Sequence, residues 1–185
     1  GEQLRACIAP AWPQLRWILQ AEQRGTGHAV QMALDDIARA DLVLILYGDT
    51  PLVRAETLQR LLEAGQQNGF ALLTTVVANP HGYGRIVRNA AGEMTAIVEE
   101  KDAGDTERAI REINTGMMAV KSEYIRRYLP QLQDYNAAGE FYLTDLIALH
   151  VAAGWRVVTV PAADSAETMG INTRAQPAQA EAVWR

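Results

Sequence analysis

The feature that most constrains the fold is an unbroken apolar run, Leu42-Val43-Leu44-Ile45-Leu46, with a loop signal, Gly48-Asp49-Thr50-Pro51, shortly after it. The run is far too short to span a membrane. An apolar run of this kind is typical of a strand covered on both faces, as in a parallel sheet. We therefore expect residues 42–46 to form a buried strand whose carboxyl end opens at Tyr47.

Strand-like and helix-like patterns alternate along the rest of the chain. Strands are expected at residues 15–20, 70–77, 114–120 and 155–160, with a β-hairpin over 86–99. A helix is expected over residues 26–37, with Thr26 as its cap. A second helix is expected from about residue 58, and Gly65 and Gly69 are expected to end it. Further helices are expected over 106–113, 123–132, 140–153 and 175–184. This alternation predicts a single α/β layered domain over residues 1–185, with a hairpin subregion at about 80–102.

Composition narrows the classes of partner. A chain of 185 residues is long enough for one substantial core, and its net charge of −5 argues against binding a nucleic-acid polymer. A single nucleotide is not excluded, because a metal ion and backbone amides can meet its phosphates. Cys7 is the one cysteine, which excludes an internal disulfide and fits a cytoplasmic protein. We expect Cys7 to be buried rather than reactive, and the N-terminal residues lack the apolar region of a signal peptide.

The end of the strand at 42–46 is the first candidate site. In open parallel sheets, ligands bind at the carboxyl ends of the strands, and this rule selects Tyr47, Gly48 and Asp49. The carboxylate of Asp49 is a suitable ligand for Mg²⁺, which binds few protein oxygens and is usually shared with phosphates. An Asx-turn before Pro51 explains Asp49 equally well.

Five other segments carry polar or glycine-rich patterns between expected elements. Each one alone has an ordinary structural explanation: a strand-to-helix turn, a hairpin entry, a solvated charge run, a polar stop before a strand, and a helix N-cap. These segments are residues 20–29, 81–86, 99–102, 112–116 and 169–173. Their order and chemistry together are far more specific than any one of them.

The combined pattern resembles a known family. The motifs that carry the resemblance are Gln20-Ala21-Glu22-Gln23-x-Gly25-Thr26-Gly27-His28-Ala29, Tyr47-Gly48-Asp49-x-Pro51-Leu52, Gly82-Tyr83-Gly84-Arg85-Ile86, Ile97-Val98-Glu99-x-Lys101-Asp102-Ala103, Glu112-Ile113-Asn114-Thr115-Gly116, Gly139-Glu140-x-Tyr142-x-Thr144-Asp145 and Gly170-Ile171-Asn172. In this order and spacing they closely resemble the uridyltransferase domain of the bacterial bifunctional N-acetylglucosamine-1-phosphate uridyltransferase/glucosamine-1-phosphate acetyltransferases. The resemblance covers nearly the whole chain. It implies a Rossmann-like, mixed and mostly parallel sheet flanked by helices.

The resemblance also implies site residues. Asp49, with a catalytic role, and Asn172 match the two protein ligands of Mg²⁺, and Tyr47 and Gly48 match the substrate-binding segment around the first of them. Gln20, Gly25 and Thr26 match the pocket that reads the uracil edge. Gly84, Glu99 and Asn114 match contacts to N-acetylglucosamine. Tyr83, Glu140 and Tyr142 fall in motifs that line the sugar side.

The implied reaction joins UTP and N-acetylglucosamine 1-phosphate to form UDP-N-acetylglucosamine and pyrophosphate with Mg²⁺, in the cytoplasm, for cell-wall precursors. Full-length members are expected to be homotrimers through an acetyltransferase domain that this chain lacks. The family's first strand, its glycine-rich loop with an arginine, and a later lysine are also missing, since neither Lys101 nor Lys121 has a matching context. We therefore expect a fragment with at most trace activity.

Two alternatives remain open at this level. One is a related nucleotidyltransferase that uses another sugar phosphate or another nucleotide. The other is a noncatalytic module that binds a sugar nucleotide. A dinucleotide-dependent dehydrogenase is disfavoured, because Gly25-x-Gly27 lacks the third glycine of a G-x-G-x-x-G turn.

Overall fold

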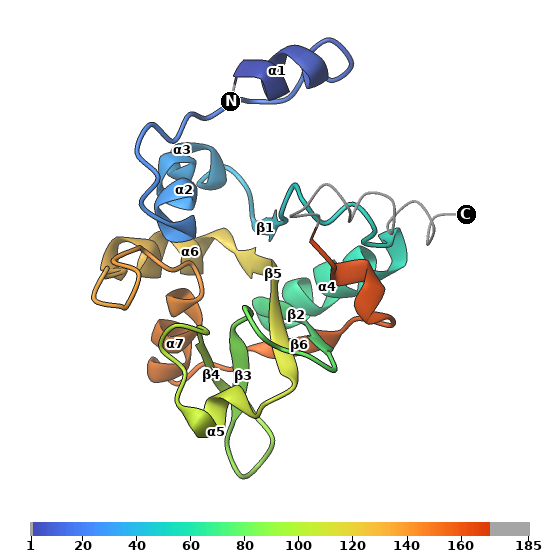
Figure 1. The fold of residues 1–185 in the computed structure, drawn as a ribbon. Helices are drawn as coiled ribbons and strands as arrows, with labels where there is room; N and C mark the ends of the chain where they lie inside the picture. Colours follow the sequence, from blue (N-terminus) through green and yellow to red (C-terminus); the bar gives the residue numbers. More distant parts are fainter. Residues whose placement is uncertain (1, 171–185) are drawn as a thin grey trace.

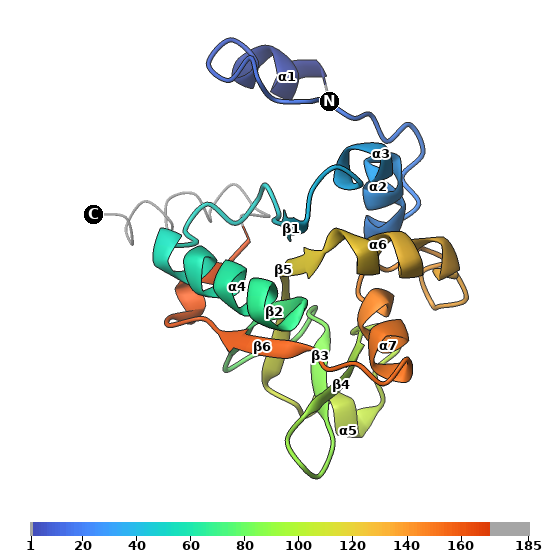
Figure 2. The ribbon, with the colours of Figure 1, turned by 180° about the vertical axis from the view of Figure 1, so that it is seen from behind.

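The structure is a computed structural model that describes residues 2–170 (Figure 1). A mixed sheet forms the centre of the molecule, with helices on both of its faces (Figures 1 and 2). The elements are α1 (Glu2–Ile8), α2 (Thr26–Met32), α3 (Leu34–Ile37), β1 (Leu42–Ile45), α4 (Ala55–Asn68), β2 (Phe70–Val76), β3 (Arg85–Arg88), β4 (Met94–Val98), α5 (Asp105–Arg108), β5 (Glu112–Lys121), α6 (Ser122–Tyr128), a 3₁₀ turn at Leu129–Gln131, α7 (Asp145–Ala152), β6 (Val158–Pro161) and a 3₁₀ turn at Ser165–Thr168.

The long strand β5 organises the sheet. One of its edges pairs with β2, while its other edge pairs with β3 near Ile113 and with β1 over Met118–Lys121. Strand β4 extends the sheet beyond β3, and β6 extends it beyond β2. The expected mixed α/β sheet flanked by helices is confirmed. Among the pairings of the described residues only β2 with β6 is parallel, because β5 runs antiparallel to all three of its neighbours, so the expectation of a mostly parallel sheet was wrong.

Side-chain alternation along β2 and β5 builds a core on each face of the sheet. Phe70 and Leu72 point to the face covered by α6 and α7, whereas Ala71 and Leu73 point to the face covered by α4. Figure 2 shows α4 lying along β2 on that second face. Both strands are almost fully buried there, so β2 and β5, rather than the strand at 42–46, form the interior of the sheet.

Strand β1 is confirmed, but its environment differs from the prediction. It pairs within the described residues with β5 alone, each of its residues is only partly buried, and Leu46 is 43% exposed just past its end. Both faces are covered only in part, since Val43 and Ile45 pack against one core cluster and Leu44 against the other, so the expectation of a buried strand was wrong. An apolar run reports hydrophobicity, whereas burial depends on which elements pack against the strand.

Glycine positions explain the length of α4. Gly65 lies inside the helix and does not end it: a Cβ atom there would be 2.6 Å from Cβ of Ala119, so the missing side chain lets α4 approach β5 closely. Gly69 ends the helix with φ +84°, the left-handed conformation that glycine adopts most easily.

The N-terminal part departs most from the sequence-based expectations. Residues 15–20 have no regular secondary structure and pair with no strand of the described chain, and Leu19 is 77% exposed. A strand needs a neighbour for its backbone hydrogen bonds, and none lies alongside in residues 2–170. Cys7 is exposed on α1, which lies away from the sheet in both views, so its predicted burial was wrong. The helix expected from 26 to 37 is interrupted at Ala33 into α2 and α3.

The remaining elements follow the sequence closely, with shifted boundaries. The hairpin of β3 and β4 and the helix α6 are confirmed, whereas α5 covers only Asp105–Arg108 because β5 already begins at Glu112. Helix α7 begins at Asp145, after the buried Leu143, and β6 begins at Val158. The helix expected at 175–184 lies outside the described residues. No helix within residues 2–170 is long and apolar enough to cross a membrane.

Candidate functional site

A cavity of about 320 Å³ opens where β1 and β4 end and β5 bends. Segments far apart in the sequence meet in its wall. The lining residues are Thr26, Tyr47, Asp49, Thr50, Gly82, Tyr83, Gly84, Glu99, Asn114, Thr115, Gly116, Glu140, Tyr142, Thr144, Thr168 and Gly170. Most of these residues are polar or glycine, so the cavity suits a ligand with many hydrogen-bonding groups.

Most of the residues predicted from the sequence lie in this wall. The cavity brings together Thr26, Tyr47, Asp49, Tyr83, Gly84, Glu99 and Asn114, with Glu140 and Tyr142 beside them. Gln20, Gly25 and Gly48 are not among the lining residues, and Asn172 lies outside the described part of the chain. Their roles in binding stay predictions. The predicted residues that do line the cavity come from separate segments of the chain, and unrelated turns and caps would not be expected to meet in one cavity.

The turn at residues 24–27 is held against residues 141–143 by backbone contacts. The amide of Gly27 donates to the carbonyl of Phe141 at 2.8 Å, and the amide of Phe141 donates to the carbonyl of Arg24 at 2.9 Å. Thr26 Oγ1 accepts from the amide of Leu143 at 3.1 Å, so Thr26 joins two segments and does not cap α2. A Cβ atom on Gly27 would be 2.9 Å from the Phe141 carbonyl oxygen, which explains the glycine.

Gln20 supports this turn from within. Its side-chain amide donates to the carbonyl of Gly25 at 3.0 Å and lies 3.1 Å from Nδ1 of His28. The Gln20 carboxamide nitrogen is therefore engaged inside the protein. Its carbonyl oxygen is the atom left for a partner outside the protein.

Burial and nearby carboxylates disfavour ionisation of Tyr47 in the cavity. Burial raises the pKa of the Tyr47 phenol above its ordinary value, the carboxylates of Glu99 and Asp49 raise it further, and a hydrogen bond with Thr26 opposes them. A phenol that stays protonated keeps its O–H as a donor. Tyr47 thus adds a neutral hydrogen-bonding group between two acids.

Glu99 follows β4 directly and is held by a threonine. Thr144 Oγ1 donates to Glu99 Oε1 at 3.0 Å, and a Cβ atom on Gly84 would be 3.0 Å from Glu99 Oε2. Burial raises the pKa of the Glu99 carboxyl above its ordinary value, the bond from Thr144 opposes this, and the carboxylates of Asp145 and Asp102 add to the rise. Thr144 was not among the predicted site residues, although it falls inside the motif from Gly139 to Asp145.

Asn114 has its polarity set by the backbone. Its side-chain Oδ1 accepts from the backbone amide of Gly116 at 2.8 Å, while the backbone amide of Asn114 donates to the carbonyl of Gly84 at 2.9 Å. The side-chain Nδ2 is therefore the group left to donate into the cavity. An asparagine side chain offers both an acceptor and a donor, and the contact with Gly116 occupies the acceptor.

Asp49 is exposed, and Thr50 rather than Asp49 makes the side-chain hydrogen bond in the turn after β1. Thr50 Oγ1 donates to the carbonyl of Tyr47 at 3.0 Å, whereas no hydrogen bond or ion pair within residues 2–170 engages the Asp49 carboxylate. The Asx-turn that competed as an explanation for Asp49 is thus absent from the described contacts. A free carboxylate facing a polar cavity fits a hard cation such as Mg²⁺ in its donor chemistry.

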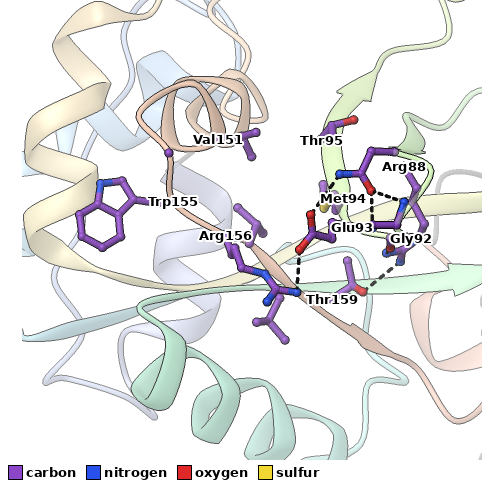
Figure 3. A pocket seen from close by; sticks show the side chains of 14 residues that line it. Arg88, Gly92, Glu93, Met94, Thr95, Val151, Trp155, Arg156 and Thr159 are labelled. Atoms are coloured by element: carbon purple, nitrogen blue, oxygen red, sulfur yellow. Dashed lines mark hydrogen bonds and ion pairs between the residues drawn. The ribbon is translucent and has the colours of Figure 1, made fainter.

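A second cavity, of about 410 Å³, shares no residue with the first (Figure 3). It lies between the turn of the β3–β4 hairpin and the segment that leads into β6. Its charged groups pair with their neighbours: Arg156 with Glu93 at 3.0 Å, and Arg88 with Glu112 at 2.6 Å. This cavity offers no unpaired charge to a ligand and none of the predicted site residues.

Comparisons with known proteins identify the family of the chain. The family model for a MobA-like NTP transferase domain matches residues 2–153. The chain is 48% identical over 185 residues to the bifunctional protein GlmU of Dichelobacter nodosus, covering 100% of this chain and 40% of that protein. It is 52% identical over 181 residues to the bifunctional protein GlmU of Stutzerimonas stutzeri, covering 98% of this chain and 39% of that protein.

A solved structure supports the fold alone. The CMP:2-keto-3-deoxy-manno-octonic acid synthetase complexed with CTP superimposes with a TM-score of 0.66 at 17% identity, over 100% of this chain and 77% of that one. The chain spans about 40% of the length of the GlmU relatives that it matches. Because the family model covers residues 2–153 and the relatives align along nearly the whole sequence, the chain belongs to the MobA-like NTP transferase domain family and corresponds to a part of the bifunctional GlmU proteins.

Proposed function

We propose that this nucleotidyltransferase domain carries the uridyltransferase site that joins UTP and N-acetylglucosamine 1-phosphate into UDP-N-acetylglucosamine and pyrophosphate. The observation that carries the proposal is one cavity that combines the Asp49 carboxylate with Glu99, Asn114 and the backbone of Gly84. The motif resemblance gives the proposal its substrate, and the identity with the GlmU relatives supports that resemblance. The product would serve cell-wall precursor synthesis.

The reaction requires positioning more than covalent chemistry by the protein. An oxygen of the sugar phosphate attacks the α-phosphorus of UTP, the new P–O bond forms, and the bond to the pyrophosphate oxygen breaks. The pyrophosphate leaves with the electron pair of that bond. No side chain of this chain has to form a covalent intermediate, so the task of the site is to align two phosphates and keep their charges apart.

Asp49 is the residue that would hold Mg²⁺, together with Asn172, which lies outside the described residues. When bound, the ion neutralises charge on phosphate oxygens. The contribution of this chain is a carboxylate at the end of β1 that has no partner among residues 2–170. Its exposure lets it reach a ligand without first breaking an internal bond.

Recognition of the sugar would come from hydrogen bonds with side chains rather than from a metal ion. Ionised Glu99 accepts hydrogen bonds from sugar hydroxyls, and its orientation is set by the bond from Thr144. Nδ2 of Asn114 donates to an acceptor such as a hydroxyl or the N-acetyl carbonyl. Tyr83 and Tyr142 add aromatic surface in the same cavity. Acceptor and donor on one wall suit a sugar with both kinds of group.

The uracil would be read by the turn at residues 20–27. A uracil edge presents an N–H between two carbonyls, and the Gln20 carbonyl oxygen and the amides of a glycine-rich turn match that pattern. Gly25 supports the fit through its positive φ of 100°, which brings the backbone of this turn against Glu140 and Phe141. Cytosine, adenine and guanine present a different order of donors and acceptors.

Titration calorimetry tests the proposal on the chain itself. UDP-N-acetylglucosamine should bind more tightly than UDP-glucose and more tightly than UDP. A pyrophosphate-release assay with UTP and a panel of sugar 1-phosphates then separates catalysis from binding. Equal affinity for all sugar nucleotides would remove the proposed specificity, and binding without turnover would assign the chain as a noncatalytic sugar-nucleotide module.

A further inference from the structure

A buried ion pair lies beside the loop that carries Tyr83. The guanidinium of Arg85, whose side chain is 2% exposed, donates to Glu100 Oε2 at 2.6 Å. Neither residue lines the candidate cavity. In the sequence Glu100 lies in the charged segment 99–102, whose ordinary explanation was a solvated charge run, and its pairing with a buried arginine was not predicted.

Both members of this pair also bond to the cavity loop. Arg85 donates to the carbonyl of Tyr83, and Glu100 Oε2 accepts from the amide of Gly82 at 3.1 Å. Two consecutive residues of the loop are therefore fixed by one guanidinium and one carboxylate. Little packs against Gly82 itself, since a Cβ atom there would have no heavy atom within 4 Å.

The C-terminal end of the loop is held by contacts with β5. The carbonyl of Gly84 accepts from the amide of Asn114 at 2.9 Å, and Arg85 is the register partner of Ile113 at the start of β3. Hydrogen bonds thus hold Gly82 and Tyr83, whereas Gly84 also packs closely against Ile97, whose Cγ2 would be 2.7 Å from a Cβ atom at that position. All three line the cavity.

We propose that Arg85 and Glu100 are positioning residues for the sugar half of the site, holding Gly82 and Tyr83 in place against the bound sugar. This inference rests on the proposed function for its ligand. A loop held before the ligand arrives loses less conformational freedom on binding, so the pair raises affinity for the sugar without touching it. Arginine suits the task because its planar fork donates to two acceptors at once.

The chain contains a matched control in the next ion pair along β3. Arg88 and Glu112 also meet at 2.6 Å, and the side chains of Glu100 and Glu112 are each 23% exposed. Arg88 borders the second cavity, and neither Arg88 nor Glu112 lines the candidate site. Glu100→Gln and Glu112→Gln therefore remove the same charge from two equally exposed carboxylates that each pair with an arginine, and only Glu100 bonds to the cavity loop.

Hydrogen–deuterium exchange and calorimetry on the full 185-residue chain test the inference. In Glu100→Gln, a peptide covering residues 80–86 should exchange faster than in the wild type. Affinity for UDP-N-acetylglucosamine should fall about tenfold while affinity for UDP is unchanged, as expected for losing charge-assisted bonds that act on the sugar half alone. Glu112→Gln should change neither the loop exchange nor either affinity.

Two results would overturn the inference. One is unchanged exchange of the 80–86 peptide in Glu100→Gln. The other is an equal loss of affinity for UDP and for UDP-N-acetylglucosamine, or an equal loss in both variants, which marks a general structural effect. If the wild type binds no UDP-N-acetylglucosamine, the proposed function is wrong, whereas the exchange of the loop still decides whether Glu100 holds it.

Discussion

The ring of Tyr47 lies against Gly116 so closely that a Cβ atom on Gly116 would be 2.1 Å from Cε2 of Tyr47. Gly116 has φ +80° and lies where the register of β5 against β2 is irregular. The pairing moves from Met118 with Leu72 to Asn114 with Thr74 across this point, so β5 carries a bulge there. The bulge makes room for the aromatic ring in the wall of the candidate cavity.

Replacing Gly116 by alanine should damage this wall. The substitution combines left-handed backbone strain with a clash against an aromatic ring, so Gly116→Ala should lower the free energy of unfolding by about 4 kcal/mol. Gly154, with φ +84° and no heavy atom within 4 Å of the place that a Cβ atom would take, provides the strain alone. Gly154→Ala should cost about 1 kcal/mol. Urea denaturation measures both, and equal losses would show that the contact with Tyr47 is unimportant.

Asp49→Asn tests the metal-binding role. It removes one negative charge from an exposed side chain, so stability should barely change, whereas turnover should fall by on the order of 10²-fold. The measurement is UTP-dependent release of pyrophosphate, which needs a preparation with measurable wild-type turnover. Asp105→Asn, at a fully exposed carboxylate outside the cavity, is the control and should leave the rate unchanged. A normal rate in Asp49→Asn would refute the role.

Asn114→Asp isolates the donor that points into the cavity. An aspartate keeps an oxygen that accepts from the amide of Gly116 and loses Nδ2 as a donor. It also adds a carboxylate to a cavity wall that already holds Asp49, Glu99 and Glu140. We expect affinity for UDP-N-acetylglucosamine to fall about tenfold with little change in affinity for UDP. Calorimetry checks this, and an equal loss for the two ligands would mean that Asn114 does not contact the sugar.

The pH dependence of sugar binding should report Glu99. Because burial raises the pKa of this carboxyl, with Asp145 and Asp102 adding to the rise, it takes up a proton at a higher pH than an ordinary glutamate. Affinity for UDP-N-acetylglucosamine should therefore decline as pH falls through the raised pKa. The same shift makes the folded protein bind that proton more tightly than the unfolded chain, so titration of Glu99 favours folding on acidification. Glu99→Gln should show weaker binding that lacks this pH dependence.

The buried His150 should make stability sensitive to mild acid. It is 1% exposed and lies among Phe70, Tyr124, Tyr128 and Trp155, with ring centroids 4.5–6.4 Å away. Burial lowers the pKa of the His150 imidazole, and a hydrogen bond with the backbone of Arg156 opposes this only in part.

The unfolded chain therefore binds the His150 proton at a higher pH than the folded protein does. The free energy of unfolding should decrease as pH falls below the ordinary histidine value, and stability is fully retained above it. His150→Phe keeps an aromatic ring and should flatten this part of the profile, measured by urea midpoints at a series of pH values. An unchanged slope would assign the acid sensitivity to other groups.

The sequence by itself determined the local elements and the chemistry of the site. Hydrophobic period and turn residues predicted β2, β5, α4, α6 and the β3–β4 hairpin, because these patterns depend on near neighbours in the chain. The order of the polar motifs pointed to Tyr47, Asp49, Glu99 and Asn114, and the cavity contains all four.

Only the tertiary structure decided how these elements pair and what each polar group is free to do. Strand direction and the burial of β1 depend on which strands pair with β5, and a hydrophobic run does not determine that pairing. The donor role of Asn114, the hold of Thr144 on Glu99 and the pairing of Arg85 with Glu100 each require an atom from elsewhere in the chain. Local sequence sets which groups a residue can offer, and long-range contacts set which of them remain for a ligand.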